Sequence, residues 1–332
     1  MPDLVTEEAI REAARVAAPV TVRTPLLSAP WLEEELDAEV RLKCESLQRT
    51  GSFKLRGAYT MIARLPPRVR QRGVVAYSAG NHAQAVALAA RLFDTTAVVV
   101  MPTDAPQVKI KGVERWGAEV VLAGRSGYER QARAEQLAAE RQLVLVPPFD
   151  HPDIIAGQGA IGLEILGEWP EVDAILVPVG GGGMLSGVAA WAKRMKPTCE
   201  VIGIGPDSSF PMNASYRAGR PVVLDEASTV ADGLRIERVS ELTLAHVNAF
   251  VDGLIAVPDN DLVAAAGQLL LNSKLVVEYA GAAGVAALQS GRWKPRGRRT
   301  AVVLSGGNID TGQLRSLATS PDFPADRRPD SR

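Results

Sequence analysis

The sequence predicts an α/β protein of two domains, each an open, mostly parallel twisted sheet covered by helices. Short runs rich in β-branched residues alternate with stretches rich in Ala, Leu, Glu and Arg, which is typical of βα units. The alternation forms two separate series along the chain. A length of 332 residues also favours about two domains.

The first series of strands and helices lies in the first half of the chain. Its first three apolar runs are each followed by a turn and a helical sequence, such as GNHAQAVALAARLF after the first run. We therefore expect a smaller domain over 65–150. The four runs predicted as strands are 73–78, 96–102, 118–124 and 143–148.

The second series occupies the second half and predicts a larger domain. We expect this domain to combine 1–64 with 151–318. The final segment, 319–332, is rich in Pro and charge and poor in apolar residues, so it is predicted to be a disordered tail. The four predicted strands are found at 173–179, 199–206, 252–258 and 300–307.

Composition excludes several classes of protein. A net charge of −1 implies no general attraction to nucleic acid or anionic lipid. No signal peptide and no long uncharged apolar window is present, so we expect no membrane span. The two cysteines, Cys44 and Cys199, fit buried free thiols of a cytoplasmic protein. None of the three histidines has a second His or Cys at metal-ligand spacing, which argues against a zinc site.

The strongest local motif is ILVPVGGGGMLSGVAAWAKRM. A buried-type strand runs into Gly180–Gly183 and then into a helix. Glycine N–H groups together with a helix N-terminus form a site for a phosphate. No Lys-Ser/Thr pair follows, and Leu185 occupies the last glycine position of a dinucleotide fingerprint, so neither nucleotide motif is matched. The alternative is a tight turn without a ligand.

The second motif, YSAGNHAQAVALAA, places Ser78, Gly80 and Asn81 between a strand and a helix. The amide can donate to an oxygen on a bound ring, and the backbone with the hydroxyl can hold a carboxylate. The alternative is a helix N-cap without a ligand. His82 could reach the same place and is better interpreted as a supporting group than as a catalyst.

The third motif, AVVLSGGNID, places Ser305 at the carboxyl end of a strand, where open α/β sheets bind ligands. A lysine completes the set. Lys54 in RTGSFKLRGA is either an ordinary solvated side chain or a desolvated amine that forms a Schiff base. A phosphate site, an amide, a hydroxyl and a lysine together suit a phosphorylated pyridine that carries an aldehyde.

Five motifs in order, SFKLRGA, SAGNHAQ, VPVGGGGMLSG, TVADGL and LSGGNID, resemble those of the serine/threonine dehydratase family. These are fold type II pyridoxal-phosphate enzymes with the fold of the tryptophan synthase β-subunit, and they include threonine dehydratases and serine racemases. The resemblance covers residues 15–312. It implies pyridoxal 5′-phosphate as cofactor and a small amino acid as substrate, with no nucleic acid or membrane partner.

The resemblance also implies a role for each matching residue. Lys54 would hold the cofactor as a Schiff base and move the proton at the substrate Cα, with its pKa lowered by desolvation and by nearby positive charge. Asn81 would bond the 3′ oxygen of the ring, and Ser305 the ring nitrogen. Phe53 would pack on the ring, Gly180, Gly181, Gly182, Gly183 and Met184 would bind the phosphate, Gly233 and Glu278 would line the pocket, and Ser78, Ala79, Gly80, Asn81, His82 and Arg130 would surround the substrate.

A hydroxyl at the ring nitrogen leaves the ring a weaker electron sink than an aspartate would, which favours β-elimination. The implied reaction converts a β-hydroxy amino acid, L-threonine or L-serine first, into a 2-oxo acid and ammonia. Other β-hydroxy amino acids, such as 3-hydroxyaspartate and phenylserine, stay open as substrates. Members of the family are commonly dimers or tetramers, which implies a homodimer or homotetramer here.

Three positions depart from the family pattern. Ala79 stands where racemases carry a catalytic serine, which favours a dehydratase over a racemase. Gly205 replaces a cation-binding glutamate, so we predict no metal at that site. Tyr279 replaces the proline after Glu278, and either narrows the pocket or only changes packing. A nucleotide-binding oxidoreductase or a binding module without catalysis is disfavoured by the failed fingerprint and by Lys54.

Overall fold

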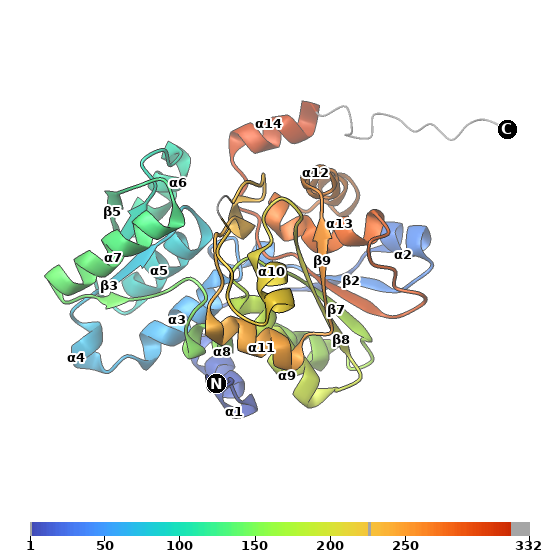
Figure 1. Ribbon diagram of the computed structural model, residues 1–332, viewed down its shortest axis with the longest axis horizontal. Helices are drawn as coiled ribbons and strands as arrows, with labels where there is room; N and C mark the ends of the chain where they lie inside the picture. The colour runs from blue at the N-terminus through green and yellow to red at the C-terminus, as the bar shows by residue number, and fades with distance from the viewer. Residues whose placement is uncertain (1, 225–226, 320–332) are drawn as a thin grey trace.

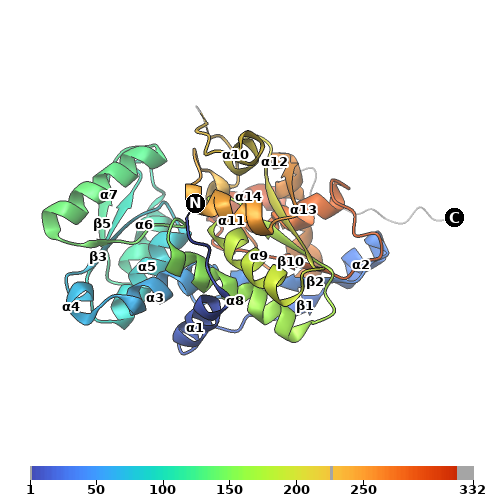
Figure 2. The same ribbon diagram turned by 60° about the horizontal axis from the view of Figure 1, so that its bottom comes forward.

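The computed structural model describes residues 2–224 and 227–319 of the chain. Except for its first residue, the predicted tail at 319–332 lies outside the described residues. The described part folds into two parallel α/β units, as expected, with the smaller sheet at the left of the view and the larger one at the right (Figures 1 and 2).

The smaller sheet has four parallel strands in the order β5-β4-β3-β6. Side chains that alternate along β3 face opposite layers of helices. Val74 and Ala76 pack with α3 and α5, whereas Val75 packs with Leu137 of α7. The strands are β3 (Val74–Tyr77), β4 (Ala97–Met101), β5 (Glu119–Leu122) and β6 (Val144–Leu145), and the helices are α3 (Lys54–Arg64), α4 (Pro67–Arg70), α5 (Asn81–Leu92), α6 (Gln107–Glu114) and α7 (Gly127–Arg141).

The larger sheet has six strands in the order β1-β2-β10-β7-β8-β9. Only β1 and β2 pair antiparallel, so the sheet is mostly parallel, as predicted. The antiparallel edge strand was not expected, because its three residues are partly exposed and show no apolar alternation. The strands are β1 (Leu26–Ser28), β2 (Val40–Lys43), β7 (Ala174–Pro178), β8 (Glu200–Pro206), β9 (Gly253–Val257) and β10 (Thr300–Val303).

Helices cover both faces of the larger sheet. Val177 on β7 faces the layer that contains α9, while its neighbour Leu176 faces the layer that contains α13. The helices of this unit are α1 (Glu7–Ala17), α2 (Pro30–Leu36), α8 (Pro152–Glu168), α9 (Gly183–Met195), α10 (Pro211–Ala218), α11 (Glu241–Phe250), α12 (Asp259–Gln268), α13 (Ala283–Gln289) and α14 (Thr311–Thr319), with short turns η1 (Glu45–Leu47), η2 (Asp232–Leu234), η3 (Leu269–Ser273) and η4 (Tyr279–Ala282).

Helix α3 joins the two units. Its apolar side chains, including Leu55 and Ile62, pack with the smaller sheet, and its other side crosses α8. The crossing is tight because two glycines meet: a Cβ added to Gly157 would lie 2.6 Å from the Cα of Gly57. The predicted boundary at residue 64 stays a prediction, and this packing supports placing α3 with the smaller unit.

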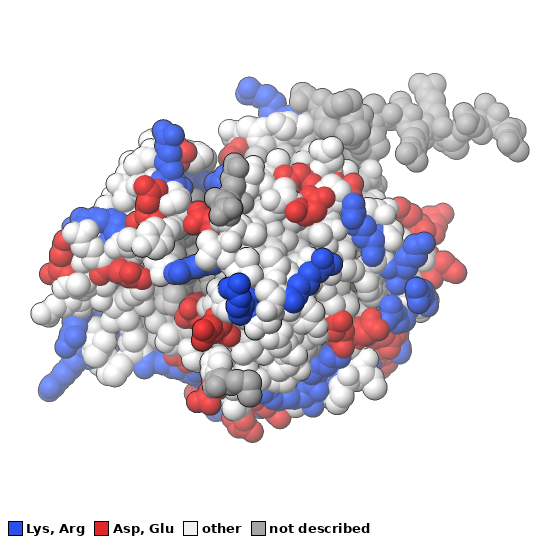
Figure 3. All heavy atoms as spheres, in the orientation of Figure 1, with Lys and Arg blue, Asp and Glu red and all other residues white. Residues whose placement is uncertain are grey.

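The outer surface carries mixed charge. Figure 3 shows basic and acidic side chains interspersed over both units on the face in view. None of the helices in the described ranges combines the length and the apolar character that crossing a bilayer requires.

Candidate active site

A cavity of about 770 Å³ lies between the two sheets and is lined by segments from both units. The carboxyl ends of β3, β7 and β10 contribute to its wall, as expected for parallel sheets. All the residues predicted to bind cofactor or substrate line this cavity, although their individual roles stay predictions. They are Phe53, Lys54, Ser78, Ala79, Gly80, Asn81, His82, Arg130, Gly180, Gly181, Gly182, Gly183, Met184, Gly233, Glu278 and Ser305.

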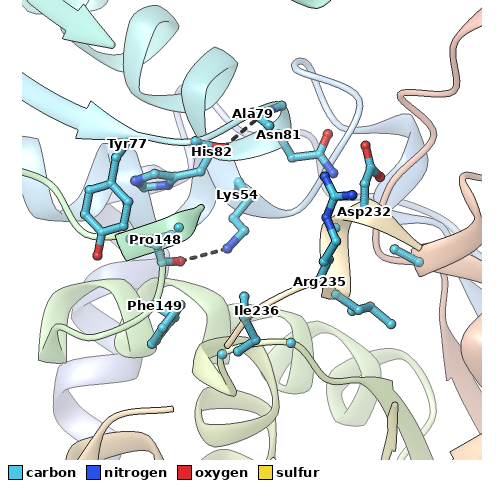
Figure 4. A pocket seen from close by; sticks show the side chains of 18 of the residues that line it. Lys54, Tyr77, Ala79, Asn81, His82, Pro148, Phe149, Asp232, Arg235 and Ile236 are labelled. Atoms are coloured by element: carbon cyan, nitrogen blue, oxygen red, sulfur yellow. Dashed lines mark hydrogen bonds between the residues drawn. The ribbon is translucent and has the colours of Figure 1, made fainter. Parts of the chain in front are cut away.

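Lys54 is the first residue of α3 and points into the cavity (Figure 4). The backbone before it is anchored to the end of β10, because the N–H of Phe53 donates to the carbonyl oxygen of Ser305 at 3.1 Å. The Lys54 amine donates to the carbonyl oxygen of Pro148 at 2.7 Å. Both anchors hold the amine beside the site predicted for the ring.

Burial lowers the pKa of Lys54 to about 8, which is the desolvation effect that we predicted. The predicted help from a nearby positive charge is wrong. The charged group that acts on the amine is the Glu278 carboxylate, which opposes the shift. About a tenth of the amine is therefore unprotonated at pH 7, far more than for an ordinary lysine, and the unprotonated amine is the nucleophile.

The glycine loop connects β7 to α9. Gly182 has φ +91°, a left-handed conformation that L-residues with side chains rarely adopt. A Cβ on Gly181 would lie 2.1 Å from the ring of Phe149, so this position also excludes a side chain. The loop ends at the N-terminus of a helix of 13 residues, where free N–H groups and the helix dipole favour an anion.

Asn81 is held in a defined orientation by two side chains from distant parts of the chain. The Asn308 amide donates to Asn81 Oδ1 at 2.7 Å, and Asn81 Nδ2 donates to Glu278 Oε1 at 2.6 Å. Because its oxygen is already engaged, Asn81 presents its N–H₂ group as a donor. Burial, then the charge of Asp232, raises the pKa of Glu278 to about 7.

His82 is buried and neutral. Its Nε2 lies 2.8 Å from the carbonyl oxygen of Val146, which can only accept, so Nε2 carries the proton. Burial lowers its pKa to about 3. Within the described ranges Nδ1 has no partner, and it is an acceptor. A carboxylate only accepts hydrogen bonds, so its partner must be a donor. Because the free Nδ1 of His82 is an acceptor, this geometry does not support the predicted contact between His82 and the substrate carboxylate.

Many groups in the cavity wall were not predicted, and four of them matter for the argument: the Pro148 carbonyl, Asn308, Asp232 and Arg235. Asn308 lies inside the LSGGNID motif, so the motif itself was a signal for it. Asp232 lies within TVADGL, and Arg235 directly follows this motif. The apolar periodicity of the motif gives no sign that both residues face a cavity. The backbone carbonyl of Pro148 has no sequence signal at all.

The position where the family places a cation-binding glutamate is closed to a side chain here. A Cβ on Gly205 would lie 2.5 Å from the ring of Phe210. In the described part of the chain, no three His, Cys, Asp or Glu residues are grouped so that they could hold a metal. The prediction of no metal stays untested by these observations.

The donors in the cavity fit pyridoxal phosphate. A row of glycine N–H groups at a helix N-terminus suits the phosphate, and a buried amine of lowered pKa suits the aldehyde. Asn81 offers a fixed amide donor to a ring oxygen, and the Ser305 hydroxyl can serve a ring nitrogen.

Comparison with known proteins gives a consistent result. The family described as "Pyridoxal-phosphate dependent enzyme" matches residues 18–306. The chain is 44% identical to an L-threonine ammonia-lyase of Thermotoga maritima over 94% of this chain and 77% of the other. It is 38% identical to an L-threo-3-hydroxyaspartate ammonia-lyase of Saccharomyces cerevisiae over 90% and 92% of the two chains. The structure of maize serine racemase matches with a TM-score of 0.90 and 34% identity, over 95% and 97% of the two chains.

Proposed function

Because this chain belongs to the serine/threonine dehydratase group of pyridoxal-phosphate dependent enzymes, we propose that it converts a β-hydroxy amino acid into a 2-oxo acid and ammonia. It is a lyase of the threonine dehydratase type, and its chemistry is β-elimination. The observation that carries the assignment of the site is the buried Lys54 amine, which shares one cavity with the glycine loop, Asn81 and Ser305.

Bound pyridoxal phosphate supplies an aldehyde to which Lys54 attaches and a ring that withdraws electrons from the substrate Cα. The residues of the chain then have three tasks. The Lys54 amine takes the Cα proton, since its lowered pKa leaves it partly unprotonated. The glycine N–H groups hold the phosphate and keep the ring in place, and the segment from Ser78 to Asn81 orients the substrate carboxylate.

The bond changes balance without any oxidant or reductant. The Cα–H and Cβ–O bonds break, a Cα=Cβ bond forms, and the hydroxyl leaves as water with one proton. The enamine that is released takes up water and loses ammonia, giving the 2-oxo acid. No net oxidation occurs, so the reaction needs no redox partner.

A racemase is the second candidate, since maize serine racemase shares the fold. Racemisation needs a proton donor on the face of the substrate opposite Lys54. Ala79 lines the cavity and carries no proton-bearing group. This favours elimination over racemisation.

The experiment that tests the function is 2-oxo acid release from a panel of β-hydroxy amino acids. We expect turnover of at least one of L-threonine, L-serine, L-threo-3-hydroxyaspartate and phenylserine. Lys54→Ala should abolish it, while the D-isomer formed from L-serine should stay undetectable by chiral chromatography. Turnover that survives in Lys54→Ala, or production of the D-isomer without 2-oxo acid, would contradict the proposal.

We also propose a homodimer or homotetramer in the cytoplasm. The two cysteines support a reducing location, because both are buried free thiols whose pKa burial raises to about 12 for Cys44 and about 11 for Cys199. Light scattering on the purified protein measures the oligomeric state, and a mass of one chain would contradict this part of the proposal.

A further inference from the structure

Arg235 is a solvent-exposed cation in the wall of the cavity. It follows η2, and Figure 4 shows its side chain extending into the cavity toward Asn81, away from Phe149. Within residues 2–224 and 227–319, its guanidinium makes no hydrogen bond and no ion pair. A guanidinium carries five N–H donors and keeps its charge at any working pH, so this group is available to an anion.

A second arginine faces the same space. Arg130 donates to the carbonyl oxygen of Arg125 at 2.7 Å, and its Nε has no partner among the described residues. Burial, and next the positive charge of Arg235, lowers the pKa of Arg130. Two like charges near each other in one cavity repel, and a bound anion relieves that repulsion.

Several acidic groups of the cavity already have partners. The Asp232 carboxylate forms an ion pair with Lys109, and Glu237 accepts from the N–H of Gly127 at 3.2 Å. Glu278 accepts from Asn81, and its raised pKa keeps it partly neutral. Asp104 and Asp310 also line the cavity, and among the described residues no carboxylate forms an ion pair with Arg235.

The cofactor phosphate does not account for this cation. The predicted phosphate site is the glycine loop, which lies against Phe149, and Arg235 extends away from Phe149 toward Asn81. The α-carboxylate of the substrate is assigned to the segment from Ser78 to Asn81. A third anion, on the substrate side chain, remains for Arg235.

We propose that Arg235 binds a carboxylate on the substrate side chain, so that the preferred substrate is a β-hydroxy amino acid with an acidic side chain, such as L-threo-3-hydroxyaspartate. This inference rests on the proposed β-elimination and specifies its substrate class. Although Arg235 is solvent-exposed, a site built to bind a charged group discriminates against analogues that lack the group, because its donors then lose that partner.

The test compares holoenzymes of the wild type, Arg235→Gln, Arg235→Lys and Arg238→Gln. Arg238 is the matched control, because it lies three residues further on, lines the same cavity and already donates to Gln131 at 3.3 Å. The readout is kcat/KM for L-threo-3-hydroxyaspartate and for L-serine. We expect the wild type to prefer the acidic substrate, and Arg235→Gln to lose about 10- to 100-fold on it.

The change on L-serine should be less than about threefold in Arg235→Gln, and Arg235→Lys should keep part of the preference because it keeps the charge. Arg238→Gln should retain the wild-type ratio. Equal loss on both substrates in Arg235→Gln, or a wild-type preference for L-serine, would overturn the inference while leaving β-elimination intact.

A binding measurement separates this inference from the proposed function. Calorimetry on the holoenzymes compares succinate, which has two carboxylates spaced as in aspartate, with butyrate, which has one. We expect succinate to bind the wild type at least about tenfold more tightly than butyrate, and this difference to disappear in Arg235→Gln. If no substrate is turned over, the proposed function fails, but the binding comparison still tests the anion subsite. Equal affinity for succinate and butyrate would overturn that subsite.

Discussion

At the scale of single residues, the chemistry depends on how the protein controls Lys54. The side chain is half-buried and held by the Pro148 carbonyl, and desolvation lowers its pKa to about 8. The same cavity contains a neutral His82 and a Glu278 whose pKa lies near 7. Burial shifts the pKa of each of these three groups toward favouring its uncharged form. The protonation of Lys54 and Glu278 near neutral pH therefore depends on the charges around them.

The pKa of Lys54 predicts how the apoprotein takes up its cofactor. Only the unprotonated amine attacks an aldehyde, so the rate of loading should rise with pH and level off above about 8, the value for Lys54. A solvated lysine would give a midpoint near 10.4. Stopped-flow absorbance after mixing with pyridoxal phosphate measures the profile.

Glu278→Gln is the informative variant for this profile. The carboxylate raises the pKa of Lys54, so its removal should move the midpoint to lower pH. A midpoint near 10 in the wild type, or a shift to higher pH in the variant, would contradict the account of the Lys54 environment.

A second residue-scale prediction concerns the buried ion cluster behind Lys54. Arg56 is 1% exposed and donates to Glu45 at 2.8 Å and to Glu164 at 2.7 Å. Arg56→Met leaves buried carboxylates with less compensation, so we expect a loss of about 3–5 kcal/mol in the free energy of unfolding. Urea denaturation at neutral pH measures it.

The pH dependence of stability should differ between wild type and Arg56→Met. In the folded wild type burial opposes ionisation of Glu45, but Arg56 overcomes it and lowers the pKa below 4.5. The wild type therefore gains stability above pH 4.5 and loses it as the pH falls through the folded pKa. Without Arg56, the burial of Glu45 favours its protonated form, so the variant should lose stability as the pH rises.

The control for Arg56→Met is Arg23→Met. It removes an exposed ion pair with Glu168 and should change the free energy of unfolding by less than about 1 kcal/mol.

At the scale of elements, the crossing of α3 and α8 places Lys54 relative to the larger sheet. Gly157 on α8 approaches Gly57 on α3 so closely that a Cβ would meet backbone atoms, which cannot move aside. Helix α8 in turn packs on α9, whose N-terminus bears the glycine loop. One helix therefore sets the distance between the amine and the phosphate site.

Gly157→Ala tests this crossing. We expect a loss of at least about 1–3 kcal/mol in the free energy of unfolding, because overpacking separates the two helices. The control is Gly167→Ala on the same helix, where nothing lies within 4 Å of the added Cβ and alanine has the better helix propensity. Urea denaturation of both variants decides, and equal stability of the two would show that the crossing is not tight.

Sequence patterns were most successful for the parallel strands and for the loops at their carboxyl ends. The predicted strand at 143–148 is shorter in the structure, ending at Leu145, because Pro147 and Pro148 lack the N–H groups that a ladder requires. The β1–β2 pair was missed because antiparallel edge pairing depends on tertiary contacts and not on local alternation. Contacts such as Asn81 to Glu278, 197 residues apart, are likewise set by the fold as a whole.

At the scale of the whole molecule, the cavity joins the two α/β units. Lys54 and Asn81 begin helices that pack with the smaller sheet, whereas Gly180–Gly183 and Ser305 follow strands of the larger one. The motifs allowed the cavity residues to be predicted, since parallel strands present their carboxyl ends at one edge. Arg235 was not predicted, because the path of the segment after η2 is decided by contacts with both units.

Cofactor removal should lower thermal stability, because the residues predicted to bind the cofactor come from both units. Ligand at 100 times its Kd adds about 2.7 kcal/mol to the free energy of unfolding. This corresponds to a rise of about 5–10 °C in Tm for units of this size. Pyridoxal without its phosphate should give a smaller rise in Tm, since it lacks the group that we predict the glycine loop to bind. Scanning calorimetry of apoprotein and reloaded protein measures both, and equal effects of the two compounds would contradict the phosphate assignment.

The central claim is that Lys54 is the attachment point for pyridoxal phosphate in a β-eliminating lyase. The most direct test is borohydride reduction of the yellow holoenzyme, followed by digestion and mass spectrometry of the labelled peptide. The account predicts a single reduced adduct on Lys54, and none in Lys54→Ala. An adduct mapped to Lys109 or to any other lysine would contradict it.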